Sequence, residues 1–155
     1  MKLYRLQRTQ TLPLSVEEAW TFFSSPQNLP SITPPWLNLA VQGEVPDAIY
    51  PGTVFHLHLT PIFGLKVVWI TEITHVDPPH YFVDEQRFGP YRFWHHQHLF
   101  RPLESGTEMT DTVSYAMKYG PFGRMLHDCI IERLLHQIFD FRQRSLERIF
   151  QSDSQ

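Results

Sequence analysis

Three histidines stand within eight residues of an apolar, aromatic segment, FWHHQHLF at residues 93–100. Imidazole titrates near neutral pH, forms hydrogen bonds and ligates transition metals. His95, His96 and His98 are therefore candidates for acid–base catalysis, metal binding or the polar lining of a cavity. The role open to each ring depends on the face of the strand from which it projects.

The neighbouring segment, 107–117, predicts that direction. Its apolar residues occupy odd positions, from Met109 to Met117, so the odd face should be buried. A two-residue loop at Ser105-Gly106 would set the register, and residues directly opposite each other share a face. The expected pairs are Phe100 with Asp111, His98 with Val113, His96 with Tyr115 and Trp94 with Met117. Trp94, His96, His98 and Phe100 should then point inward and His95 outward.

Asp111 belongs to the same inward face, near His98. A buried carboxylate must be hydrogen-bonded or lie in a hydrated cavity, and an imidazole is a suitable partner. Three interpretations stay open. The pair is a structural hydrogen bond, or part of a polar patch in a ligand cavity, or a catalytic dyad in which Asp111 holds His96 or His98 as general base.

Two H-x-H pairs, His56/His58 and His96/His98, have the i, i+2 spacing that places both rings on one face of a strand. Asp111 would supply a third ligand beside the second pair, as a zinc site requires. The apolar residues of TVFHLHLT alternate out of phase with the first pair, which should therefore be exposed. On balance the sequence favours no metal ion and no other cofactor.

The elements that must position these residues follow from hydrophobic periodicity. Residues 3–12 predict a strand, and Ser15 with Glu18 forms a capping box that should start a short helix. Six strand candidates follow, at 37–42, 53–60, 65–76, 80–88, 91–103 and 107–117, joined by short turns typical of antiparallel hairpins. From Gly120 to about Phe150 the pattern is helical. The expected class is α+β, with helices on one face of a curved antiparallel sheet.

Length and composition narrow the function classes. The chain has 155 residues, a formal charge of −3 and one cysteine, Cys129. One domain over 1–150 with a disordered tail at 151–155 is expected, with no internal disulfide. No basic patch points to nucleic acid, and no apolar run is long enough for a signal peptide or a membrane span. We expect a cytoplasmic protein.

Three blocks, in order, resemble the START/SRPBCC superfamily of helix-grip proteins, which includes pollen-allergen-like and polyketide cyclase/dehydrase-like members. The first is LPLSVEEAWTFFSSPQNLPSITPPW. The second, FVDEQRFGPYRFWHHQHLF, is similar to a bacterial subgroup signature that marks Asp84, Gln86, Trp94, His96 and His98. The third is GTEMTDTVSYAMKYGPFG. The resemblance implies a curved seven-stranded antiparallel sheet wrapped around a long C-terminal helix, with two short helices after the first strand.

The resemblance also implies a cavity between sheet and helix for a small hydrophobic or amphipathic molecule, and no catalytic residue is shared across the superfamily. The expected walls are Trp94, Phe100, Tyr115 and Met117 from the sheet and Met125, Leu126, Ile130 and Leu134 from the helix, with His96, His98 and Asp111 as polar groups. Asp84 and Gln86 depend on the Gly89-Pro90 turn. A simple two-residue loop would turn both outward, whereas a bulge, which we expect, would turn both inward.

Three functions are compatible with this pattern. The first is a binder of a small hydrophobic ligand. The second is a cyclase, dehydratase or hydrolase that uses His96 or His98 with Asp111 in the same cavity. The third is a protein-interaction module or homodimer, suggested by Tyr91, Phe93 and Leu99 on the expected outer face of one strand.

Overall fold

A seven-stranded antiparallel sheet dominates the computed structural model, which describes residues 1–62 and 64–151. The strand order is β1-β7-β6-β5-β4-β3-β2. The bounds are β1 Tyr4–Leu12, β2 Ala40–Gln42, β3 Val54–Leu59, β4 Val67–Asp77, β5 Tyr81–Phe88, β6 Tyr91–Leu103 and β7 Gly106–Met117. The predicted α+β class, the seven strands and their antiparallel order are confirmed.

Three short helical segments separate β1 from β2. In α1 (Val16–Phe23), the Ser15 hydroxyl accepts a hydrogen bond from the Glu18 backbone N–H, and the Glu18 carboxylate accepts one from the Ser15 backbone N–H. This reciprocal pair is the predicted capping box. Two 3₁₀ helices follow, η1 (Pro26–Ile32) and η2 (Pro35–Leu37). The residues at 37–39 precede β2, so this strand is shorter than predicted.

The C-terminal helix is interrupted near its start. It consists of α2 (Gly120–Leu126), a π turn η3 (His127–Ile131) and α3 (Glu132–Gln151). The buried His127 lies in the π turn, where its ring stacks on Tyr4 and its Nε2 lies 2.9 Å from the Tyr115 hydroxyl. The helix continues one residue into the predicted disordered tail, and the remainder of that tail, 152–155, lies outside the described residues.

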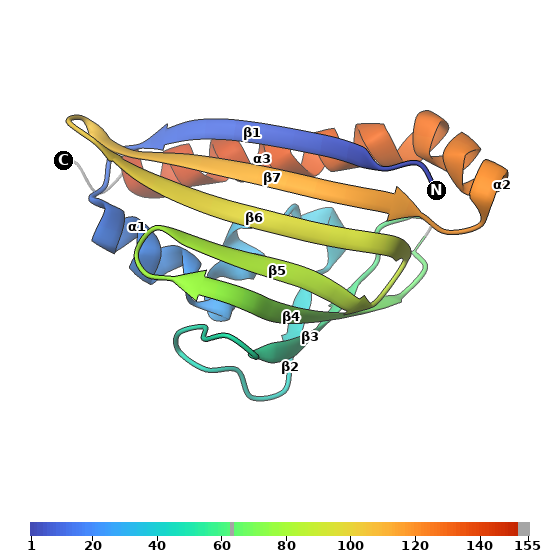
Figure 1. Cartoon of the computed structure of the whole chain (residues 1–155), viewed down its shortest axis with the longest axis horizontal. Coiled ribbons are helices and arrows are strands. Elements are labelled where there is room, and N and C mark those ends of the chain that lie inside the picture. The colour runs from blue at the N-terminus through green and yellow to red at the C-terminus, as the bar shows by residue number, and fades with distance from the viewer. Residues whose placement is uncertain (63, 152–155) are drawn as a thin grey trace.

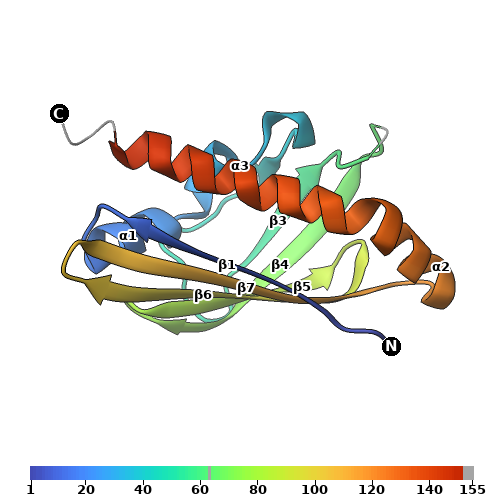
Figure 2. The ribbon, with the colours of Figure 1, turned by 90° about the horizontal axis from the view of Figure 1, so that it is seen from above.

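The helix lies across the concave face of the sheet (Figures 1 and 2). Seen from above, α3 runs along the side formed by β1 and β7, while α1 covers one end of the sheet (Figure 2). Leu135, Phe139, Leu146 and Phe150, which recur at helical spacing, are buried on the inward side of α3. The fold therefore encloses a space between a curved sheet and one long amphipathic helix.

The hairpin between β6 and β7 differs in register from the prediction. Leu103 lies opposite Gly106, so the loop is Glu104-Ser105. The observed pairs are Phe100 with Met109, His98 with Asp111, His96 with Val113 and Trp94 with Tyr115. The predicted register was therefore wrong by two residues. A shift by an even number leaves every side chain on its predicted face, because the side-chain period of a strand is two.

The hairpin between β5 and β6 has the one-residue offset that we expected from a bulge, because Asp84 lies opposite His96 rather than His95. The side-chain amide of Gln86 donates to the Tyr91 carbonyl at 2.9 Å, and its oxygen accepts from the Tyr91 N–H at 3.1 Å. The Gln86 side chain thus replaces a backbone partner, and the strands pair with Asp84 opposite His96. Gly89 fits tightly here, because a Cβ on it would overlap the Gln86 amide.

Candidate functional site

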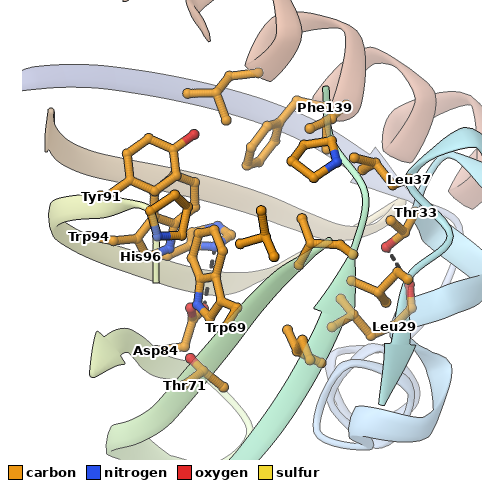
Figure 3. A pocket seen from close by; sticks show the side chains of 18 of the residues that line it. Leu29, Thr33, Leu37, Trp69, Thr71, Asp84, Tyr91, Trp94, His96 and Phe139 are labelled. Carbon is orange, nitrogen blue, oxygen red and sulfur yellow. Dashed lines mark hydrogen bonds and ion pairs between the residues drawn. The ribbon is translucent and has the colours of Figure 1, made fainter. Parts of the chain in front are cut away.

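A cavity of about 510 Å³ lies between the sheet, η1 and the C-terminal helix. Its walls are mostly apolar, and Figure 3 shows Leu29 and Leu37 on one side facing Trp69, Tyr91 and Trp94 on the other. Helix α3 closes the space with Leu134, Leu135, Ile138 and Phe139. A cavity of this size and lining is typical of small-molecule sites.

Four side chains form a polar cluster at the aromatic end of the cavity: the half-buried Asp84 from β5, and the buried His96 and His98 from β6 and Asp111 from β7. The pairing of the strands explains the cluster, since Asp84 lies opposite His96 and Asp111 lies opposite His98. Asp84, His96 and His98 line the cavity, whereas Asp111 lies behind the two rings.

The two imidazoles lie against each other with their centroids 3.8 Å apart and their planes inclined by 38°, and a carboxylate lies at each edge of the pair. At one edge, Asp84 Oδ2 lies 2.8 Å from His98 Nε2 and 3.3 Å from His96 Nδ1. At the other edge, Asp111 Oδ1 lies 2.9 Å from His96 Nε2 and also 2.9 Å from His98 Nδ1. The last contact is close but out of line for a hydrogen bond, so His98 Nδ1 is a buried polar atom with no hydrogen-bond partner among the described residues.

Arg142 of α3 brings a positive charge to this group. Its Nε lies 3.8 Å from Asp111 Oδ2, and its guanidinium packs over the rings of Phe23 and Phe139. The Nε is buried and has no hydrogen-bond partner within the part of the chain that the structure describes. Because Arg142 also lines the cavity, it is placed to interact with the polar part of a bound molecule.

The environment separates the pKa values of these groups. Burial opposes ionisation of Asp111, but Arg142 and both imidazoles hold its pKa well below the ordinary value. Burial also disfavours the charged form of Asp84, yet His96 and His98 lower its pKa. Burial and the charge of His98 lower the pKa of His96, whereas the two neighbouring carboxylates, Asp111 and Asp84, outweigh burial and raise the pKa of His98. The cluster thus favours two ionised carboxylates, with its proton on His98 rather than His96.

Comparison with known proteins places this geometry in a family. Residues 12–139 match the family model of polyketide cyclase / dehydrase and lipid transport proteins. The chain belongs to this family. None of the curated proteins matches it, and within residues 1–62 and 64–151 no helix is long and apolar enough to cross a membrane.

Solved structures support the family's fold. TTHA0849 from Thermus thermophilus is 20% identical, with a TM-score of 0.68 over 99% of this chain and 100% of that one. NE0264 from Nitrosomonas europaea is 17% identical, with a TM-score of 0.70 over 96% and 95%. Ara h 8.0201 is 14% identical, with a TM-score of 0.61 over 94% and 98%. At these identities the likeness concerns the helix-grip fold alone, and the predicted START/SRPBCC resemblance is confirmed.

The side chains of β6 that were predicted to point inward do so. Trp94, His96, His98 and Phe100 are all buried on the inner face, and His95 lies on the outer face, paired with Glu85. The residues that were predicted for the site and line the cavity are Trp94, His96, His98, Asp84, Met117, Leu126 and Leu134.

The remaining predicted wall residues lie elsewhere. Phe100 and Tyr115 are buried in the packed core, and Asp111 is one layer behind the cavity. Met125 is exposed and Ile130 does not line the cavity, because the π turn rotates this part of the helix. Gln86 contributes to the β5–β6 bulge instead of the wall.

The outer apolar stripe expected for a partner protein is interrupted. A second register shift, between Tyr91 and Phe93, turns Tyr91 inward, where it is buried against Trp69 and Trp94. Phe93 and Leu99 remain exposed, at 38% and 48%. The prediction for Tyr91 was wrong because the alternation of side chains fails at a bulge.

Arg142 is a charged residue of the cavity lining that sequence reasoning missed. It stands at i+3 from Phe139 and i+7 from Leu135, in the middle of the buried stripe of α3. A charged residue at such a position was a readable signal, because buried charges are rare unless they are paired. Trp69 and the β3 residues Phe55 and Leu57 were also missed as wall residues. Their alternation indicated burial but not which buried face borders a cavity.

Proposed function

We propose that this protein binds a small amphipathic molecule in the cavity between the sheet and α3. One observation carries the proposal: a largely apolar cavity of about 510 Å³ has Asp84, His96, His98 and Arg142 together in its lining. Burial of apolar surface supplies affinity, and convergent polar groups fix orientation. Membership of a family described by cyclase, dehydrase and lipid transport functions supports a ligand of this kind.

The first experiment is native mass spectrometry of freshly purified protein, followed by extraction of whatever is bound. We expect a complex whose excess mass corresponds to one small apolar or amphipathic molecule. In parallel, the naphthalene dye ANS, which fluoresces in apolar sites, should bind the stripped protein with saturation.

A cavity-filling variant locates the binding. Leu135 on α3 lines the cavity, so Leu135→Trp should occupy part of it and weaken dye binding by about tenfold or more. The matched control is Leu99→Trp, which adds the same side chain at an exposed position of β6. Equal dye binding by both variants and the wild type would show that the cavity is not the binding site.

A second function is favoured by the contact between His96 and Asp111. His96 lines the cavity, and its Nε2–H donates to the buried carboxylate at 2.9 Å. This arrangement orients an imidazole whose Nδ1 serves as a general base toward a bound molecule. The test compares the mass of the extracted ligand before and after incubation with the wild type and with His96→Gln. A change of mass produced by the wild type alone supports catalysis, and an unchanged ligand supports binding only.

A further inference from the structure

The cavity wall contains three side chains whose ligating atoms converge. Asp84, His96 and His98 each offer one such atom, and these atoms lie within 4.8 Å of one another. The contacts around Asp84 Oδ2 are 2.8 Å to His98 Nε2 and 3.3 Å to His96 Nδ1. Two imidazoles and one carboxylate are a ligand set that first-row transition metals prefer.

The hydrogen-bonding pattern of the two imidazoles favours a cation between Asp84, His96 and His98. His96 donates its Nε2–H to Asp111, so a neutral ring turns the lone pair of Nδ1 toward the Asp84 carboxylate. If neutral His98 donates its Nε2–H to Asp84, the lone pair of its buried Nδ1 faces Asp111 Oδ1 at 2.9 Å. In this neutral form both contacts set lone pair against lone pair, a conflict that an additional proton on His98 relieves in the metal-free protein and that a bound cation would relieve in its place. A cation between Asp84 and the two rings lets each ring turn a lone pair toward that cation and an N–H toward Asp111.

We propose that Asp84 Oδ2, His96 Nδ1 and His98 Nε2 bind one divalent first-row transition-metal ion. Asp111 then accepts a hydrogen bond from His96 Nε2 and, once the His98 ring has turned its Nδ1–H into line, a second one from His98, as carboxylates behind metal-bound histidines commonly do. Arg142, at 3.8 Å from Asp111, offsets part of the charge of that carboxylate.

The distances are compatible with a metal ion. Ligand atoms at about 2.0–2.1 Å from a tetrahedral zinc ion lie about 3.3 Å apart. The observed separations from Asp84 Oδ2 to the two nitrogens are 2.8 and 3.3 Å, at or just below that value. The two ring nitrogens lie within 4.8 Å of each other, and small rotations of the rings would bring them to the same spacing.

Three protein ligands leave a coordination position open, which is typical of metal sites that receive water or substrate. Here that position faces the cavity, because Asp84, His96 and His98 all line it and Asp111 lies behind them. The inference rests on the proposed ligand-binding function and deepens it: the metal ion would coordinate an oxygen or nitrogen atom at the polar end of an amphipathic molecule.

The test uses the full chain, treated with a chelator and dialysed. Zn²⁺ is titrated by calorimetry and the bound metal is counted by mass spectrometry, and Co²⁺ is followed by its visible absorption. We expect about one ion per chain and an intense Co²⁺ absorption typical of tetrahedral or five-coordinate nitrogen and oxygen ligation. Asp84→Ala should weaken Zn²⁺ binding by more than about 100-fold, and Asp111→Asn by about 10–100-fold.

The chain offers a matched control in the other H-x-H pair. His56 and His58 share the spacing but are exposed on β3, so the double variant His56→Gln, His58→Gln should bind Zn²⁺ as the wild type does. Loss of binding in that variant, or no stoichiometric binding of Zn²⁺ or Co²⁺ by the wild type, would overturn the proposal.

Two further measurements keep the outcomes distinct. Circular dichroism and thermal unfolding establish whether each variant is folded, and if Asp84→Ala is not, the Co²⁺ absorption of the wild type decides. ANS binding is measured on the chelator-treated protein. Dye binding without any metal binding overturns the metal site and leaves the proposed ligand-binding function intact.

Discussion

The two H-x-H pairs of this chain have the same local sequence pattern and opposite surroundings. His56 and His58 project from β3 into solvent, while His96 and His98 project from β6 into the interior beside two carboxylates. Local spacing places two rings on one face in both cases. The neighbouring strands decide the rest, because β3 pairs with the short edge strand β2, whereas β6 lies between β5 and β7, which supply Asp84 and Asp111.

The comparison shows how an identical motif acquires different chemistry. A solvated imidazole keeps its ordinary hydration, and its contribution to stability is small. A buried imidazole must find a partner for each ring nitrogen, since an unpartnered polar group in the interior is costly. The four-residue cluster is therefore a constraint on folding as well as a candidate site.

The largest effect should come from removing a carboxylate behind the buried pair. Asp111→Ala leaves Arg142 and two imidazoles without their shared anion, and breaking a buried charge pair costs about 3–5 kcal/mol. Urea unfolding should show a loss in the free energy of unfolding of about 3 kcal/mol or more. Ser114→Ala on the same strand, opposite His95, is the control and should change stability by less than about 0.5 kcal/mol. Equal losses would contradict the role of Asp111.

A smaller loss is expected at the hairpin that sets the register of the buried pair. Gly106 has φ +134°, and a Cβ there would overlap the Leu12 carbonyl oxygen. We expect Gly106→Ala to cost about 1–3 kcal/mol in urea unfolding. The control is Gly52→Ala, which also has positive φ, +93°, but has open space around the added Cβ. A loss at Gly106 no greater than that at Gly52 would show that the close approach to Leu12 does not matter.

The buried pair should also make stability depend on pH in the metal-free protein. The pKa of His98 is raised from 6.5 in the folded state by its two carboxylate partners, despite burial. Protonated His98 therefore contributes stability that is fully present below pH 6.5 and is lost as the pH rises through its folded pKa. The difference in the free energy of unfolding between wild type and His98→Gln, measured in a chelator, should narrow from about pH 6 to about pH 9. A difference that stays constant would mean that His98 does not carry the proton of the cluster.

The smallest effect belongs to the exposed pair. Because His56 and His58 lie on the solvent side of β3, the double variant His56→Gln, His58→Gln should change the free energy of unfolding by less than about 0.5 kcal/mol. Thermal unfolding at neutral pH checks this. A larger loss would show that the edge of the sheet depends on these rings and would remove the contrast between the two pairs.

Much of the fold follows from local pattern. The period of two in seven segments, the Ser15–Glu18 capping box and the helical stripe after Gly120 predicted the elements, and short turns predicted antiparallel pairing. The face of His96 and His98 was also predictable, because a register wrong by two residues leaves the side-chain alternation intact. The exposed position of Met125 was not predictable, because a π turn breaks the helical period. The buried position of Tyr91 was not predictable either, because a bulge breaks the alternation of the strand.

By itself, then, the amino-acid sequence determined which segments are strands and helices and which faces are apolar. The residues that bury one face of a strand or helix recur at a fixed spacing along the chain, so this hydrophobic pattern can be recognised in the sequence. Only the tertiary structure decided that Asp84, Asp111 and Arg142, from three different elements, meet around two adjacent imidazoles beside a cavity. Hydrogen bonds and charge pairs act over a few ångströms in space, and those distances exist only when the sheet and the long helix have packed.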